Sequence, residues 1–209
     1  LIWNIQTDIE NMQTIKNNSN SKKPEVVIFA GPNGSGKSTI YQIAITRGIY
    51  INADIIKAST HCDDLTAAMQ AEALRENALA HKQDFTFETV LSTERNLNLL
   101  RRAKEQGYFV RGYFVFTRHP NVNVMRVHSR AEEGGHDVPV DKILKRYKLT
   151  MSQLPALIEI CDICHVYDNT QSPYRIFKKR KDEIFLFPST IWPEENIKAL
   201  VYLNDDEDE

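Results

Sequence analysis

Short apolar stretches of strand length alternate along this chain with longer segments whose apolar residues recur at helical spacing. Residues 26–30 are all apolar, which is typical of a strand buried on both faces, and further strands are predicted at residues 85–91, 108–116 and 163–167. Helices are predicted at residues 38–47, 65–82, 93–106, 120–130 and 140–160, with Pro155 interrupting the last one. Residues 174–177 and 184–187 are expected to form a C-terminal β-hairpin around residues 178–183. The alternation predicts an α/β fold of three layers (α/β/α), in which helices cover both faces of a mainly parallel sheet.

The two ends of the chain differ in composition from the part between them. Residues 1–24 are polar and rich in Asn, and a small apolar face near the start predicts a short N-terminal helix followed by a polar linker. Residues 201–209 are expected to form an acidic tail, because the last five are all acidic and repel one another. We therefore expect one domain, over residues 25–200.

The charge is nearly balanced, with 26 Lys and Arg against 28 Asp and Glu, and this excludes a histone-like protein. Without the five terminal acids, 26 basic residues face 23 acidic ones, so the rest of the chain carries a charge of +3. Three cysteines are too few and oddly numbered for a disulfide framework. No apolar run approaches the roughly 20 residues of a membrane-spanning helix. We expect a cytoplasmic protein without a membrane partner.

A glycine-rich motif directly follows the first predicted strand and opens the next predicted helix. Residues 31–38, GPNGSGKS, match the phosphate-binding pattern G-x-x-x-x-G-K-[ST] at every fixed position. The glycines let the backbone curl so that successive amides point into one concavity at the positive end of the helix. Lys37 is expected to reach the outer phosphates of ATP, and the Ser38 hydroxyl to ligate Mg²⁺. The predicted nucleotide-binding residues are Gly31, Pro32, Asn33, Gly34, Ser35, Gly36, Lys37, Ser38 and Thr39.

Two carboxylates are candidates for the chemistry beside this loop. Asp54 follows a short apolar stretch, and the carboxyl ends of strands meet at the ligand crevice of such sheets. It is interpreted either as the base that takes a proton from an acceptor hydroxyl or as the N-cap of the next helix. Glu88 lies in an otherwise apolar strand and needs a partner. That partner is a substrate hydroxyl, the Mg²⁺ shell or the cation of a structural salt bridge.

Seven basic residues form a third candidate group. Guanidinium groups stabilise the negative charge that spreads over the oxygens in phosphoryl transfer. Two of the seven, Arg126 and Arg130, are four residues apart and share a helix face. For most members a solvated charged surface is the alternative. The group comprises Arg118, Arg126, Arg130, Lys142, Lys145, Arg146 and Lys148.

The motifs, in this order, resemble the zeta-toxin family of P-loop kinases. The likeness rests on PNGSGKST at residues 32–39, INAD at 51–54 and FET at 87–89. Arg126 and Arg130, then GGH at 134–136, VP at 138–139, Ile143 and RY at 146–147 are similar to the bacterial predicted-kinase branch of that family. The resemblance covers residues 25–170 and implies a P-loop kinase-like fold with a helical lid.

The resemblance also implies a reaction and its partners. Zeta toxins transfer the γ-phosphoryl group of ATP to the 3′-hydroxyl of the sugar in UDP-N-acetylglucosamine, so ATP, Mg²⁺, a sugar-nucleotide substrate and an antitoxin protein are implied. Lys37 and Ser38 then bind ATP and Mg²⁺, Asp54 is the base, and Glu88 and Thr89 bind the sugar nucleotide. The lid arginines are expected among Arg126, Arg130 and Arg146. His136 follows two glycines and is expected to contact substrate, to act at a lid hinge or simply to pack. The spacing between the arginines departs from that of the better-known toxins.

Two other functions stay open at this point. The chain is alternatively a nucleotide or nucleic-acid end kinase, although nucleic acid is the less expected substrate, or a nucleotide-dependent interaction module without phosphoryl transfer. Cys161 and Cys164 form an isolated CxxC, which we interpret as buried thiols, since zinc needs two more ligands. Asp168 and Asn169 follow the last core strand and are interpreted either as neighbours of the adenine or as a simple turn.

Overall fold

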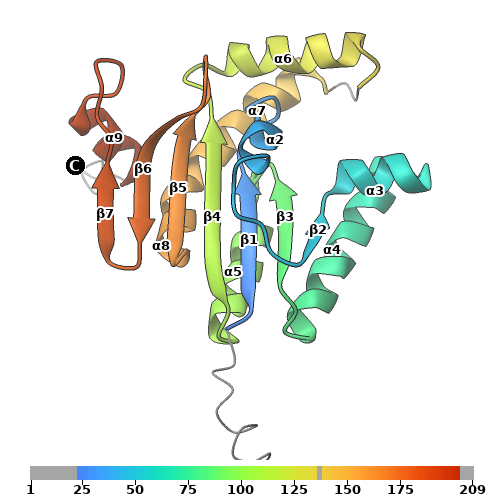
Figure 1. Cartoon of the computed structure of the whole chain (residues 1–209). Coiled ribbons are helices and arrows are strands. Elements are labelled where there is room, and N and C mark those ends of the chain that lie inside the picture. Colours follow the sequence, from blue (N-terminus) through green and yellow to red (C-terminus); the bar gives the residue numbers. More distant parts are fainter. Residues whose placement is uncertain (1–22, 136–137, 203–209) are drawn as a thin grey trace, which may run out of the picture.

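The structure is a computed structural model of the whole chain, and it describes residues 23–135 and 138–202 (Figure 1). The predicted N-terminal helix and most of its linker lie outside the described residues. The same holds for His136 and for most of the acidic tail.

A seven-stranded sheet forms the centre of the molecule, in the order β2-β3-β1-β4-β5-β6-β7 (Figure 1). The strands from β2 to β5 in this order run parallel, whereas β6 and β7 are antiparallel to their neighbours. This confirms the mainly parallel sheet and the C-terminal hairpin. The strands are β1 (Glu25–Ala30), β2 (Ile49–Ile51), β3 (Phe85–Thr89), β4 (Phe109–Phe116), β5 (Ile163–Asp168), β6 (Tyr174–Arg180) and β7 (Glu183–Leu186).

Eight described helices connect or follow the strands. The predicted helix at residues 140–160 divides near Gln153 into two helices, as Pro155 led us to expect. The helix predicted at residues 65–82 begins one residue earlier, at Asp64, and the carboxylate of its N-cap residue Asp63 accepts a hydrogen bond from the Thr66 amide. The helices are α2 (Lys37–Tyr41), α3 (Ala53–Thr60), α4 (Asp64–Ala80), α5 (Arg95–Glu105), α6 (Pro120–Glu132), α7 (Val140–Ser152), α8 (Leu154–Ile160) and α9 (Glu194–Val201).

Two predicted boundaries are wrong by more than two residues, and each has a local cause. The helix expected at residues 38–47 ends at Tyr41. The chain beyond it is held on the sheet, because the Ile45 amide donates to the Tyr113 hydroxyl (3.2 Å) and the Arg47 amide donates to Thr86 Oγ1 (2.8 Å). The basic residues expected in the hairpin turn continue β6 to Arg180, so the turn itself is short and has Lys181 at a φ of 53°.

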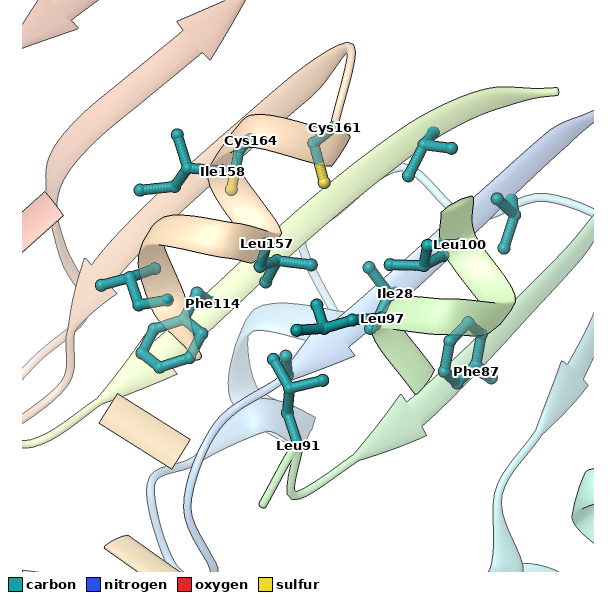
Figure 2. Close-up of a cluster of buried hydrophobic side chains, with 14 of the residues drawn as sticks. Ile28, Phe87, Leu91, Leu97, Leu100, Phe114, Leu157, Ile158, Cys161 and Cys164 are labelled. Carbon is teal, nitrogen blue, oxygen red and sulfur yellow. The ribbon is translucent and has the colours of Figure 1, made fainter. Parts of the chain in front are cut away.

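The main hydrophobic core lies between the sheet and the helices α4, α5, α8 and α9. Figure 2 shows Leu97 and Leu100 of α5 and Leu157 of α8 packed over Ile28 of β1 and Phe114 of β4. The same view shows Cys161 and Cys164 beside α8, and both are buried free thiols, as predicted. In the described part of the chain, no cluster of three His, Cys, Asp or Glu could hold a metal ion.

The opposite face of the sheet has a smaller cluster around α2. Phe29 of β1 stacks on Tyr113 of β4, with ring centroids 5.0 Å apart, and Ile40 of α2 packs in the same cluster. The parallel strands all end at the edge of the sheet where α2, α6 and α7 gather (Figure 1). The functional groups discussed below lie at this edge. None of the helices in the described ranges is both long and apolar enough to span a bilayer.

Candidate active site

The glycine-rich loop connects β1 to α2, and its curvature depends on two glycines. Gly34 and Gly36 have φ values of 73° and 87°, in the left-handed region that glycine occupies without strain. A Cβ on Gly36 would lie 2.0 Å from Nδ2 of Asn169, and one on Gly34 would lie 2.6 Å from the carbonyl oxygen of Asn123. The loop therefore needs glycine both for its conformation and for close packing.

Lys37 is folded onto the loop that precedes it. Its side chain is 7% exposed, and its ammonium group donates to the carbonyl oxygens of Gly31 (2.9 Å) and Pro32 (3.1 Å). It also lies 3.6 Å from Oε1 of Glu88. Burial lowers the pKa of Lys37, and the carboxylates of Glu88 and Asp54 partly offset this by favouring the charged form. The positive charge thus lies between the loop and two carboxylates.

Glu88, near the end of β3, has partners for both of its oxygens. Oε1 forms the ion pair with Lys37, while Oε2 accepts hydrogen bonds from the Tyr50 hydroxyl (3.0 Å) and from Nδ2 of Asn52 (3.3 Å). The structure therefore contains the salt bridge that was one of the three interpretations of Glu88. Burial raises the pKa of Tyr50, so its hydroxyl remains a donor at neutral pH.

Asp54 lies in the first turn of α3, and its side chain does not cap that helix. Asn52 is the N-cap, and its Oδ1 accepts the amide hydrogen of Asp54 at 2.8 Å. The cap interpretation of Asp54 is therefore wrong, because the helix begins at Ala53, two residues before the start at Ile55 that an Asp54 cap would require. The exposed Asp54 carboxylate is near enough to Lys37 to influence its pKa.

The predicted lid arginines lie on α6 and α7. Arg126 is half-buried and donates from Nη2 to the carbonyl oxygen of Thr170 (3.0 Å). Arg130, on the same helix, is exposed, and its charge contributes to the lowered pKa of Lys37. Arg146 is half-buried on α7. By contrast, Arg118 pairs with Asp168 at 3.4 Å, which gives it a structural role.

The other predicted residues differ in their surroundings. The Thr89 hydroxyl accepts hydrogen bonds from the Leu91 amide (3.1 Å) and from Nδ2 of Asn96 (2.8 Å), which fixes the loop after β3. Ser38 and Thr39 are exposed at the start of α2. Lys142, Lys145 and Lys148 are exposed on α7, in agreement with a solvated surface.

Two asparagine side chains hold the glycine-rich loop from distant parts of the chain. The buried Asn123 of α6 donates from Nδ2 to the carbonyl oxygen of Asn33 (2.5 Å). Asn169, which follows β5, donates from Nδ2 to the carbonyl oxygen of Ser35 (2.8 Å). The sequence pointed to Asn169 because it directly follows a core strand. It did not point to Asn123, since one amide in an amphipathic helix carries no distinctive local pattern.

The strand, glycine-rich loop and helix at the centre of this sheet, with the buried lysine, define a P-loop protein with an α/β fold. The sequence model of the Zeta toxin family matches residues 47–189, more than half of the chain. The chain belongs to the Zeta toxin family. The match begins after the glycine-rich loop, so the loop and the family match are separate observations.

Solved structures share this fold over most of the chain. A structure from a study of the PezAT chromosomal toxin–antitoxin system of Streptococcus pneumoniae has a TM-score of 0.56 and 17% identity, covering 93% of this chain and 92% of that chain. The AvrRxo1-ORF1:-ORF2 crystal structure with ATP has a TM-score of 0.67 and 14% identity, covering 87% of this chain and 63% of that chain. The predicted P-loop kinase-like fold is thereby confirmed.

A curated relative has a higher sequence identity. An uncharacterised protein of Haemophilus influenzae is 28% identical over 130 residues, which cover 59% of this chain and 92% of that protein. This similarity adds no function.

Proposed function

We propose that this protein is a cytoplasmic, ATP-dependent kinase that phosphorylates a hydroxyl of a sugar nucleotide similar to UDP-N-acetylglucosamine. The observation that carries the proposal is the cluster of Lys37, Glu88 and Asp54 beside the glycine-rich loop. The loop and Lys37 suit a triphosphate, and the exposed Asp54 carboxylate suits proton transfer from an acceptor. Membership of the Zeta toxin family supports the same reaction.

In the proposed reaction, an acceptor hydroxyl oxygen attacks the γ-phosphorus of ATP. A new P–O bond forms, the bond from the γ-phosphorus to the β,γ-bridging oxygen breaks, and ADP leaves. Asp54 takes the hydroxyl proton, while Glu88 and Thr89 hold the acceptor. Arg126, Arg130 and Arg146 are proposed to stabilise the charge on the transferred group, since guanidinium forks match phosphate oxygens. His136 is proposed to contact the acceptor.

The residues present fit a magnesium ion that is bound together with the nucleotide. Mg²⁺ usually takes only one or two protein ligands in such sites and completes its shell with phosphates and water. The exposed Ser38 hydroxyl at the start of α2 is the proposed protein ligand. When bound, the ion would neutralise phosphate charge.

We also propose an antitoxin protein as a partner, a suggestion that rests on the family. The study that describes the Streptococcus pneumoniae structure concerns a toxin–antitoxin system. Co-purification with the product of a neighbouring gene, and inhibition of phosphoryl transfer by that product, would support this partner.

The decisive experiment is transfer of labelled phosphate from ATP to a panel of acceptors led by UDP-N-acetylglucosamine, with Lys37→Ala as the blank. Asp54→Asn is expected to lower turnover at least about 100-fold, as for loss of a general base, and to leave ATP affinity nearly unchanged. Asp63→Asn is the matched control, because Asp63 caps α4 and Asn caps equally well.

The alternatives predict different results. Labelling of an oligonucleotide end, with affinity that falls steeply as salt rises, would identify a nucleic-acid end kinase. ATP binding without transfer to any acceptor would identify an interaction module. Normal transfer by Asp54→Asn would refute the role of Asp54 as the base.

A further inference from the structure

We infer that Asn52 is a positioning residue, which sets the two carboxylates of the proposed site, Asp54 and Glu88, relative to one another with the help of Tyr50. The inference rests on the proposed function, because it assigns a role to residues beside the same chemistry. It adds two residues that have no role in the reaction proposed above.

Both ends of the Asn52 amide are used, each by a different carboxylate-bearing segment. Oδ1 accepts the Asp54 amide hydrogen at 2.8 Å, while Nδ2 donates to Oε2 of Glu88 at 3.3 Å and to the Tyr50 hydroxyl at 3.2 Å. The opposite orientation of the amide would place its oxygen against the carboxylate and its NH₂ against an N–H group. The contacts therefore determine the orientation, and one rigid planar group links the start of α3 to the end of β3.

The local fold places Asn52 at the junction that such a link requires. β2 is a three-residue edge strand that pairs with β3, with Ile51 opposite Phe87. Asn52 follows it with extended backbone angles, φ −136° and ψ 124°, and the next residue begins α3. Asn52 therefore lies directly between the strand that pairs with β3 and the first residue of α3.

Tyr50 holds the link on its other side. Its ring contacts that of Tyr41 in α2, with centroids 4.4 Å apart, and its hydroxyl donates to Oε2 of Glu88. Tyr50 and Asn52 thus both hold Oε2, while Oε1 faces Lys37. When phosphate oxygens compete for the ammonium group of Lys37, these two donors would keep Glu88 in place for the acceptor.

The experiment compares Asn52→Asp, Asn52→Ser and Tyr50→Phe with wild type and with the control Asp63→Asn. Asp and Ser both preserve the helix cap. Asn52→Asp replaces the NH₂ donor with a carboxylate oxygen and so adds a third carboxylate beside Glu88 and Asp54. In Asn52→Ser the side chain is too short for its hydroxyl to reach Glu88. For both Asn52 variants, kcat with the acceptor is expected to fall at least about tenfold, the size of a lost hydrogen bond to a charged group. The kcat of Tyr50→Phe should fall by a similar factor, because the Tyr50 hydroxyl donates to the same carboxylate oxygen. The KM for ATP should change less than about threefold in all three variants.

A variant that only loses stability would keep the pH profile of the wild-type rate. The acid limb of the rate profile of Asn52→Asp is expected at higher pH, because a neighbouring negative charge favours protonation of carboxylates. Its melting temperature should stay close to that of Asp63→Asn. Wild-type kcat and an unchanged pH limb in Asn52→Asp, or wild-type kcat in Asn52→Ser, would overturn the inference.

A measurement that needs no acceptor distinguishes failure of the proposed function from failure of the Asn52 link. The carboxyl ¹³C chemical shift of Glu88 can be measured in the protein alone at a single neutral pH, and it should differ from wild type in Asn52→Ser, which loses the Nδ2 donor, whether or not the protein is a kinase. Absence of transfer by wild type would refute the proposed function. An unchanged Glu88 chemical shift in Asn52→Ser would refute the link itself.

Discussion

The ion pair between Lys37 and Glu88 makes a prediction about stability that is independent of any substrate. Glu88→Gln preserves the shape of the side chain and its contacts with Tyr50 and Asn52, but removes the charge that lies 3.6 Å from a buried ammonium group. The attraction at this distance is at most about 4–5 kcal/mol with an effective dielectric constant of about 20. Glu88 is 21% exposed, so water screens part of this attraction.

We therefore expect Glu88→Gln to lower the free energy of unfolding by about 2 kcal/mol, between the values typical of exposed and of buried pairs. Lys37→Met should cost less than about 1 kcal/mol or should stabilise the fold, because it removes the buried charge. Glu88 then keeps its two hydrogen-bond donors. In the Lys37→Met background, Glu88→Gln should change the free energy of unfolding very little.

The sign of the pH dependence follows from the lowered pKa of Lys37. Between this folded-state value and the ordinary value of 10.5, the unfolded chain binds more protons, so this residue makes the fold more stable as the pH rises. Without Glu88 the pKa should be lower still, because its carboxylate favours the ammonium form. The stability difference between wild type and Glu88→Gln should therefore narrow from pH 7 to about pH 9.5.

Urea unfolding of the four proteins, followed by circular dichroism, measures the double-mutant cycle at both pH values. Groups that titrate equally in all four cancel in the coupling energy. A coupling energy below about 0.5 kcal/mol at neutral pH, the usual limit of additivity, would refute the reasoning. If the stability difference between wild type and Glu88→Gln does not change with pH, Lys37 is not the group that responds to Glu88.

Two further predictions concern the loop and the sheet. Gly36→Ala should abolish nucleotide binding, measured by calorimetry, because the φ of Gly36 is 87° and a Cβ would meet Asn169. The control is Gly107→Ala, at a φ of 86° with open space around it, which should lose only about 1 kcal/mol of stability and bind the nucleotide normally. Burial, with nearby basic residues, lowers the pKa of His165 to about 4, so the stability of the fold should decrease by about 3 kcal/mol as the pH falls from 6.5 to 4. His165→Phe, which can keep the stacking on Tyr113, should lose this dependence in acid unfolding curves; an equally steep curve would contradict it.

Elements with a strong local pattern could be predicted from the sequence, and those that depend on distant contacts could not. The apolar run of β1 and the periodic face of α5 mark their elements because burial acts on each separately. The early end of α2 could not be predicted, since it depends on hydrogen bonds to Tyr113 and Thr86 in other strands. A helical propensity over residues 42–47 is outweighed by these contacts.

The candidate site shows the same division. Glu88 was recognised as a carboxylate in need of a partner, but its partners depend on β3 lying between β1 and β2. Asn52 and Asp54 are both good N-cap residues, so local preference could not decide between them. The register of α3 decides in favour of Asn52, and this leaves the Asp54 side chain available.

The contacts of Asn123 and Asn169 with the glycine-rich loop have a consequence for biosynthesis. The two hydrogen bonds join residues 90 and 134 positions apart, so the motif is translated long before the groups that hold it in shape. A nascent chain still missing Asn169 has every residue of the phosphate-binding pattern but not its finished geometry. For an enzyme with a proposed antitoxin partner, this order of assembly delays nucleotide binding, and with it any activity, until most of the chain has left the ribosome.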